Sequence, residues 1–176
     1  MNLKITYKTF AVVGLLIMAL AAVFYFSGVR VNTTKSIPLG FYKTTDVKAK
    51  KGDYVLFCPT DAEVFIEAKK RGYISTGLCD GSTGLMMKKI LAAKDDVVSS
   101  GVNGVFVNGK KLTNSTPKVK DGNGNLMQIF IAEKVVLDDS QVLLMSDSSA
   151  NSFDARYFGL VNKSQIKSKI EPVFNW

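Results

Sequence analysis

The sequence predicts a mainly β domain that follows a single N-terminal transmembrane helix. Residues 9–29 carry no charged side chain, turn-forming residues divide the rest of the chain into short apolar segments, and only one later segment has helical spacing. About 145 residues remain after the apolar N-terminus, which is enough for one domain with a hydrophobic core. We therefore expect one domain over residues 30–176.

The apolar N-terminal segment has the length of a membrane anchor. At about 1.5 Å per residue, residues 9–29 span the roughly 30 Å hydrocarbon core of a bilayer. A cleaved signal peptide is the alternative, because Lys4 and Lys8 precede the apolar run. The bulky Phe24-Tyr25-Phe26 and the lack of a small-residue cleavage site favour an uncleaved anchor. Residues 1–8 are then expected in the cytoplasm and residues 30–176 on the far side of the membrane.

For the domain itself, the sequence predicts short strands and one helix. A hairpin turning on Asn108-Gly109 is expected within residues 104–112. Residues 61–71 have helical spacing, with Thr60 or Asp61 as the N-cap. Other strands are expected at 53–57, 85–93, 128–132, 141–145 and 158–161.

Cys58 and Cys79 are the two cysteines of the chain. An even cysteine count in an exported domain favours a disulfide, which here would close residues 58–82 into an inserted helical cap. Two unrelated buried thiols are the alternative. A zinc site is not expected, because two cysteines without any histidine supply too few of the usual ligands.

The formal net charge of +8 raises the question of nucleic-acid binding. The basic residues are scattered in short clusters rather than gathered in a stripe with interleaved aromatic residues. We expect a basic surface beside anionic lipid headgroups and no nucleic-acid partner. The turn-rich segment Asp121–Asn125 lacks a full calcium-loop pattern and is read as a plain turn, so neither a metal nor a cofactor is expected.

Ser36 lies just beyond the anchor, where a nucleophile could reach substrates held at the bilayer surface. A serine hydroxyl needs a base to take its proton, and the chain contains no histidine. A lysine can serve if burial keeps it neutral. Lys88 and Lys89 lie in the apolar segment 85–93, but adjacent strand residues point to opposite faces and periodicity does not choose between them. Two lysines capping a strand end are the alternative reading.

A third polar segment, residues 145–159, directly follows the apolar residues 142–145. It is dense in hydroxyls and carboxylates, which is typical of a polar turn. The same groups could also orient a neutral lysine, with Asp154 and Arg156 forming an ion pair.

Three motifs in this order resemble a known family. They are Asn32-Thr33-Thr34-Lys35-Ser36-Ile37-Pro38, the Lys88-Lys89 pair, and Asn151-Ser152-Phe153-Asp154-Ala155-Arg156-Tyr157-Phe158-Gly159. The arrangement resembles the type I signal peptidases, which are Ser–Lys proteases, and is most similar to their conjugative-transfer branch of TraF-type pilin-processing peptidases. The chain departs from the family pattern at Lys94-Asp95-Asp96, at Ala155 and at Ser146-Asp147-Ser148.

The resemblance implies a signal-peptidase-like β fold and a role for each matching residue. Ser36 matches the nucleophile, and Lys88, the first lysine of the pair, matches the general base in preference to Lys89. Ser152 matches a serine that hydrogen-bonds the lysine. Asp154 matches an aspartate that gives structural or electrostatic support in this branch, and Arg156 matches the arginine of the family's Asp-Ser-Arg.

Thr34 matches the residue whose hydroxyl joins the Ser36 N–H in the oxyanion hole. Removing one such donor typically costs about 10²–10³ in rate.

The resulting expectation is a serine endopeptidase of the bacterial inner membrane, with one membrane span and its catalytic domain in the periplasm. It would remove a signal or pro-segment from a translocated pilin precursor, or another exported protein, in conjugative transfer. Cyclisation of the pilin through the acyl-enzyme is a second outcome that the sequence leaves open. A housekeeping signal peptidase and a non-catalytic scaffold of a conjugation or secretion apparatus are the alternatives.

Overall fold

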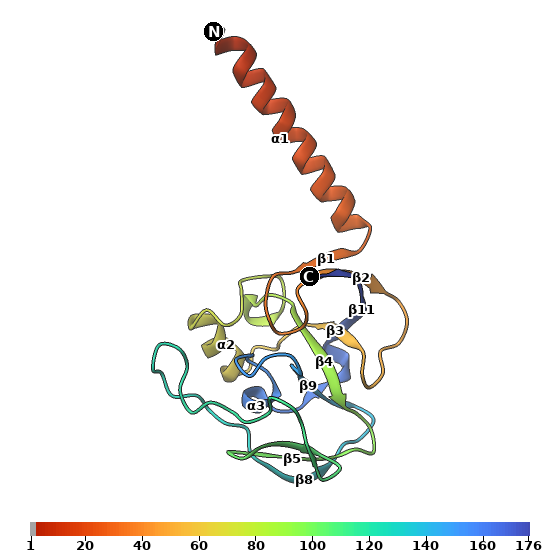
Figure 1. Ribbon diagram of the computed structural model, residues 1–176, viewed down its shortest axis with the longest axis vertical. Coiled ribbons are helices and arrows are strands. Elements are labelled where there is room, and N and C mark those ends of the chain that lie inside the picture. The colour runs from red at the N-terminus through yellow and green to blue at the C-terminus, as the bar shows by residue number, and fades with distance from the viewer. Residues whose placement is uncertain (1–2) are drawn as a thin grey trace.

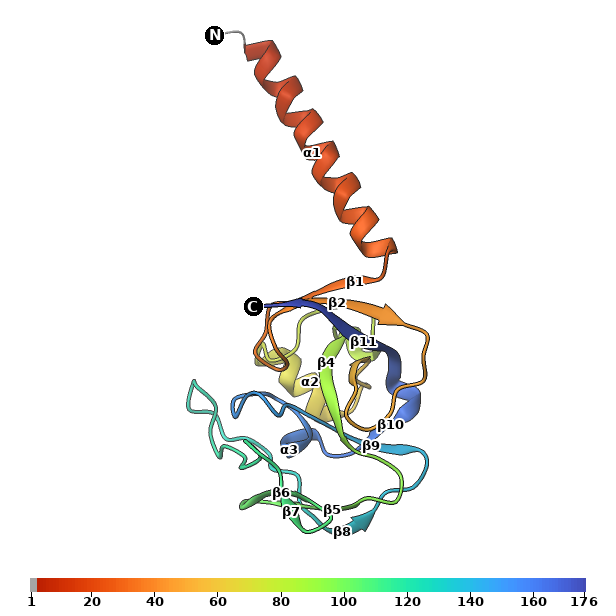
Figure 2. The same cartoon turned by 45° about the vertical axis from the view of Figure 1, so that its right-hand side comes forward.

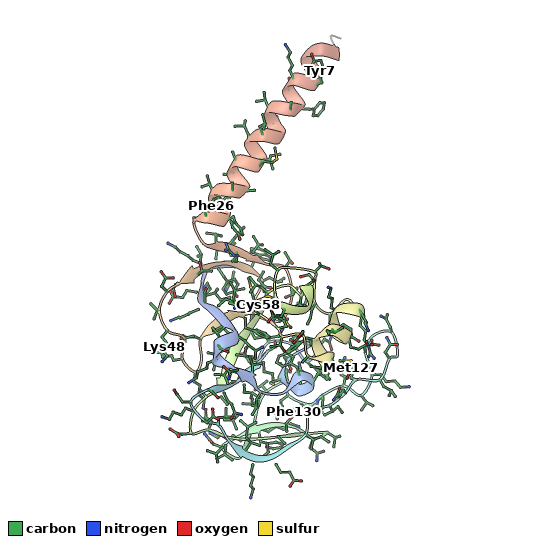
Figure 3. The ribbon with its side chains drawn as sticks, turned by 180° about the vertical axis from the view of Figure 1, so that it is seen from behind. Tyr7, Phe26, Lys48, Cys58, Met127 and Phe130 are labelled. Carbon is green, nitrogen blue, oxygen red and sulfur yellow. A yellow bond between two sulfur atoms is a disulfide. The ribbon has the colours of Figure 1, made fainter. Side chains whose placement is uncertain are left out.

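The computed structural model describes residues 3–176, and its most prominent helix, α1 (Leu3–Phe26), projects away from a β domain (Figure 1). Residues Tyr7–Phe26 form a helix of 20 residues that is long and apolar enough to cross a membrane, by length and composition. Their side chains stand clear of the domain, with Phe26 near it and Tyr7 near the far end (Figure 3). The first two residues of the predicted cytoplasmic segment 1–8 lie outside the described residues.

The helix ends earlier than the predicted anchor. Gly28 has a φ of 78°, and a β-carbon there would collide with the Thr44 hydroxyl. The chain turns at this glycine, so that Val29, the last residue of the predicted span, already belongs to a strand.

A seven-stranded antiparallel sheet forms the main layer of the domain, in the order β1-β2-β11-β3-β4-β9-β10. The C-terminal strand lies between β2 and β3 and ends beside the start of β2, at the end of β1 that is farther from α1 (Figures 1 and 2). The strands are β1 (Val29–Asn32), β2 (Gly40–Thr45), β3 (Tyr54–Phe57), β4 (Met86–Ala92), β9 (Gln141–Met145), β10 (Val161–Asn162) and β11 (Ile166–Asn175).

A second, four-stranded sheet in the order β7-β6-β5-β8 forms the end of the domain opposite α1 (Figure 2). The predicted hairpin is confirmed, because β6 and β7 pair across Asn108-Gly109, both of which have positive φ. The strands are β5 (Val97–Gly101), β6 (Gly104–Val107), β7 (Lys110–Lys111) and β8 (Ala132–Val136). The mainly β fold class is thus confirmed.

Two predicted strands are wrong. Residues 128–131 form no strand, and β8 begins only at Ala132, because the Phe130 N–H donates to the Arg156 carbonyl and the Phe130 carbonyl accepts from Ser100. In the predicted strand 158–161, Phe158 is the last residue of α3 (Ala155–Phe158), residues 159–160 belong to no helix or strand, and only Val161 is in a strand, β10. The helix stops at Gly159, which has a φ of 78°.

The predicted cap is present and closed by a disulfide between Cys58 and Cys79, whose Cα atoms are 5.4 Å apart. It contains α2 (Glu63–Lys70) and the short 3-10 helix η1 (Asp80–Ser82), and a second 3-10 helix, η2 (Lys163–Gln165), precedes β11. The predicted N-cap of α2 is wrong: Ala62 holds that position without a side-chain bond, and Thr60 Oγ1 accepts only from the Ala62 N–H, at 3.4 Å.

Candidate active site

The turn that carries Ser36 joins β1 to β2 and is held by Asn32. The buried Asn32 amide donates to the carbonyls of Thr34, Ile37 and Pro38 at 2.8, 2.9 and 3.0 Å, and its oxygen accepts from the Thr34 N–H. Ile37 is fully buried. Sequence reasoning assigned no role to Asn32, although an asparagine at a strand end is a common organiser of turns.

Lys88 approaches this turn from β4. It alternates along the strand with Lys89 and shares the buried face with Met86 and Ile90. The Lys88 Nζ lies 2.8 Å from Ser36 Oγ. The whole Lys88 residue is only 2% exposed. Burial removes water from the ammonium and lowers the pKa of Lys88 to about 8, an effect that the nearby Asp154 carboxylate opposes and the Arg156 guanidinium reinforces.

Lys89 points to the opposite face of the strand. Its ammonium donates to the Asp147 carboxylate at 2.6 Å and lies 5.4 Å from the centre of the Tyr54 ring. The bond to Asp147 raises the pKa of Lys89, which keeps this lysine charged. The structure therefore brings only Lys88 of the pair to Ser36, which periodicity alone did not decide.

Ser152, Asp154 and Arg156 belong to one buried network behind Ser36. The Ser152 hydroxyl donates to Ser36 Oγ at 3.4 Å, which is at the long end of hydrogen-bond distances. The Asp154 carboxylate accepts from Arg156 Nε at 2.8 Å, and neither side chain is exposed. Asp154 also accepts from the N–H of Ser146, a buried serine to which the sequence analysis assigned no role.

Arg156 organises the loop that presents Ser152. The guanidinium donates to four backbone carbonyls, those of Asn114, Ser149, Ala150 and Ser152. Because a buried guanidinium must satisfy its donors, these bonds hold the loop in one conformation.

The predicted oxyanion-hole donors differ in their availability. Within residues 3–176 the Ser36 N–H has no hydrogen-bond acceptor, so it is free to bind a developing oxyanion. The Thr34 hydroxyl donates to Asn32 Oδ1 at 3.0 Å. It would have to turn away from Asn32 to act as the second donor.

These groups open onto a cleft of about 430 Å³ between the Ser36 turn, the start of β4 and the cap. Tyr73, Ile74 and Ser75 of the cap line it opposite Ser36 and Lys88. A polypeptide carbonyl held in this cleft would meet a hydroxyl, a lysine with a depressed pKa and a free backbone N–H. This combination is suited to acyl transfer from a peptide bond.

A β fold with a serine and a buried lysine in one cleft is the architecture expected of a signal peptidase. The sequence model of the family described as signal peptidase, peptidase S26, matches residues 4–176. The chain belongs to this family, which confirms the predicted signal-peptidase-like fold.

The relatives that the chain resembles include two proteins of Escherichia coli, each called plasmid transfer protein TraF. One is 51% identical over 165 residues, which cover 94% of this chain and 93% of the relative. The other is 46% identical over 169 residues, which cover 96% of each. A crystal structure of a signal peptidase I from Enterococcus faecalis V583 aligns with a TM-score of 0.40 and 16% identity, covering 72% of this chain and 100% of that one.

Proposed function

We propose that the chain is a serine peptidase in which Ser36 is the nucleophile and Lys88 the general base. The observation that carries the proposal is the 2.8 Å separation of Lys88 Nζ and Ser36 Oγ in a buried site. Neutral Lys88 takes the hydroxyl proton while Ser36 Oγ attacks the scissile carbonyl, whose oxygen the Ser36 N–H stabilises. The C–N bond then breaks, the leaving amine receives the proton from Lys88, and an acyl-enzyme remains on Ser36.

The buried network supports this dyad by positioning it. Ser152 lies beside Ser36 Oγ, and the Asp154–Arg156 pair holds the loop on which Ser152 stands. The negative charge of Asp154 also counteracts the effect of burial on Lys88, so that the pKa of Lys88 falls less than it would without this carboxylate. Thr34 joins the oxyanion hole if its hydroxyl leaves Asn32 when substrate binds.

The substrate we propose is a translocated pilin precursor of a conjugation system, and the products are a shortened pilin and the released segment. Full-length similarity to two plasmid transfer proteins supports this substrate class. The acyl-enzyme is resolved by water, or by the amino terminus of the pilin, which would yield a cyclic product.

We further propose that α1 anchors the chain in the bacterial inner membrane, with the domain in the periplasm. The helix is of membrane-spanning length, and the disulfide fits an oxidising compartment. Three aromatic side chains are exposed on the side of the domain from which α1 leaves, as is typical at a bilayer surface: Phe41 in β2, Phe174 in β11 and Trp176 directly after β11.

The proposal can be tested in a conjugating cell whose wild-type gene is replaced by a gene for a single-residue variant. We expect Ser36→Ala to abolish plasmid transfer and to let the unprocessed precursor accumulate, whereas the exposed Ser164→Ala retains both activities. Normal transfer with the Ser36→Ala protein would instead support a non-catalytic scaffold. Processing of several unrelated exported precursors would indicate a housekeeping signal peptidase.

A further inference from the structure

Two smaller cavities adjoin the catalytic cleft behind a pair of aromatic side chains. They measure about 260 and 130 Å³, and the smaller one lies against α2. Tyr73 and Phe153 line both cavities and the cleft, so the three spaces share walls. Phe153 directly follows Ser152, the residue beside the nucleophile, and therefore lies between the reaction centre and the cavities.

One wall of the larger cavity, which we call the aromatic cavity, is formed by Tyr73, Phe153, Tyr157 and Met127 and is held in place, while Asn151 and Gly122 also line the cavity. Phe153 stacks on Tyr157 with ring centres 5.8 Å apart and an angle of 6° between the planes. Tyr73 lies 5.6 Å from Phe153, and Met127 Sδ lies 3.5 Å from the Tyr73 hydroxyl. The Tyr157 hydroxyl accepts from the Lys118 N–H at 3.0 Å. Such a wall is preformed for an apolar side chain.

The rim of the aromatic cavity is basic. Lys118 and Lys120 are exposed and form no ion pair within the described part of the chain. Asp121 also lies at the rim, but its carboxylate accepts from the Tyr73 hydroxyl, the N–H groups of Asn123 and Asn125 and the Asn125 amide. These neutral donors leave the Asp121 carboxylate charged, but two ammonium groups face this one carboxylate, so the rim has a net positive charge.

We propose that the aromatic cavity is a second substrate subsite, which takes an apolar side chain of the precursor with a carboxylate beside it. Tyr73 and Phe153 would then be specificity-determining residues, and Lys118 and Lys120 would select the negative charge. The carboxylate comes from an acidic side chain or from the free C-terminus of the released segment. This inference rests on the proposed peptidase function, since it extends the cleft at Ser36 along the bound chain.

Cleavage of a positional peptide set by the full chain in detergent micelles tests the subsite. Each peptide is a decapeptide of neutral residues with a single Glu, Gln or Lys, and the set places this residue at every position in turn. Every peptide is made in two forms, with a free and with an amidated C-terminus. Mass spectrometry reports the cleavage site and the relative kcat/KM. Glu preference in amidated peptides indicates a side-chain carboxylate, and preference for the free acid indicates a chain terminus.

The decisive comparison is between two charge-reversal variants of equal net charge. Lys118→Glu/Lys120→Glu changes the rim, and Lys110→Glu/Lys111→Glu changes exposed lysines on β7. We expect the wild-type protein and the β7 variant to prefer the carboxylate peptides about tenfold, and the rim variant to lose or reverse this preference. The same preference in all three proteins overturns the subsite alone. Absence of cleavage by the wild type, or cleavage by Ser36→Ala, overturns the proposed function and the subsite with it.

Discussion

The depressed pKa of Lys88 makes the pH dependence of the reaction a quantitative prediction. A lysine can act as a base only when it is neutral, and its pKa of about 8 lies well below the ordinary value of 10.5. The neutral fraction is then about 1% at pH 6, half at pH 8 and roughly 90% at pH 9. We expect kcat/KM to rise roughly ninetyfold from pH 6 to pH 9, by about tenfold per unit at the acid end.

The assay is precursor processing at low substrate concentration, with the folded fraction of the enzyme checked at each pH. Lys89→Ala is the matched control, because Lys89 faces Asp147 rather than Ser36, and we expect the same midpoint for it. A flat profile between pH 6 and 9 would refute the reasoning. So would a midpoint near that of an ordinary exposed lysine, since it would mean that burial does not lower the pKa of the base.

Three further predictions concern single contacts. Lys88→Ala is expected to lower kcat by about 10²–10⁴ in the same assay, while Lys89→Ala stays near wild type; the reverse result would transfer the base role to Lys89. Asp154→Asn leaves the buried Arg156 unpaired, so denaturant unfolding should show a loss of about 3–5 kcal/mol, and the activity midpoint should move below pH 8 because a charge that raises the Lys88 pKa is gone. Replacing Cys58 and Cys79 by serine opens a loop of sequence separation 21 and should cost about 3 kcal/mol, with faster hydrogen exchange in residues 58–82; unchanged exchange there would contradict the cap's dependence on the bridge.

Sequence patterns within a few residues predicted those elements that depend on neighbouring residues alone. The Asn108-Gly109 hairpin and strand β9 were predicted at or near their observed bounds, because turn chemistry and an apolar run suffice to define them. Strand β11 was not predicted. It has one buried residue, Ile170, and contains Pro172 at an irregularity in its pairing, so its extended conformation depends on bonds to β2 and β3.

In the candidate site, too, some residues could be assigned from the sequence, and others only from contacts between distant segments. The position of Ser36 beyond the anchor made it a candidate nucleophile, whereas the choice of Lys88 over Lys89 followed from motif resemblance, because alternation along the strand left both lysines open. Asn32 and Phe153 could not be assigned roles from the sequence, because their functions arise only from contacts between the Ser36 turn, the cap and the loop after β9.

The central claim, that Ser36 is the nucleophile that cleaves a precursor, is tested most directly by mass spectrometry of a purified pilin precursor incubated with the full-length protein. We expect the wild type and Ser164→Ala to convert the precursor to a shortened product at one site. A further loss of one water would mark cyclisation. Ser36→Ala should return the precursor at its original mass, and cleavage at the same site by that variant would contradict the account.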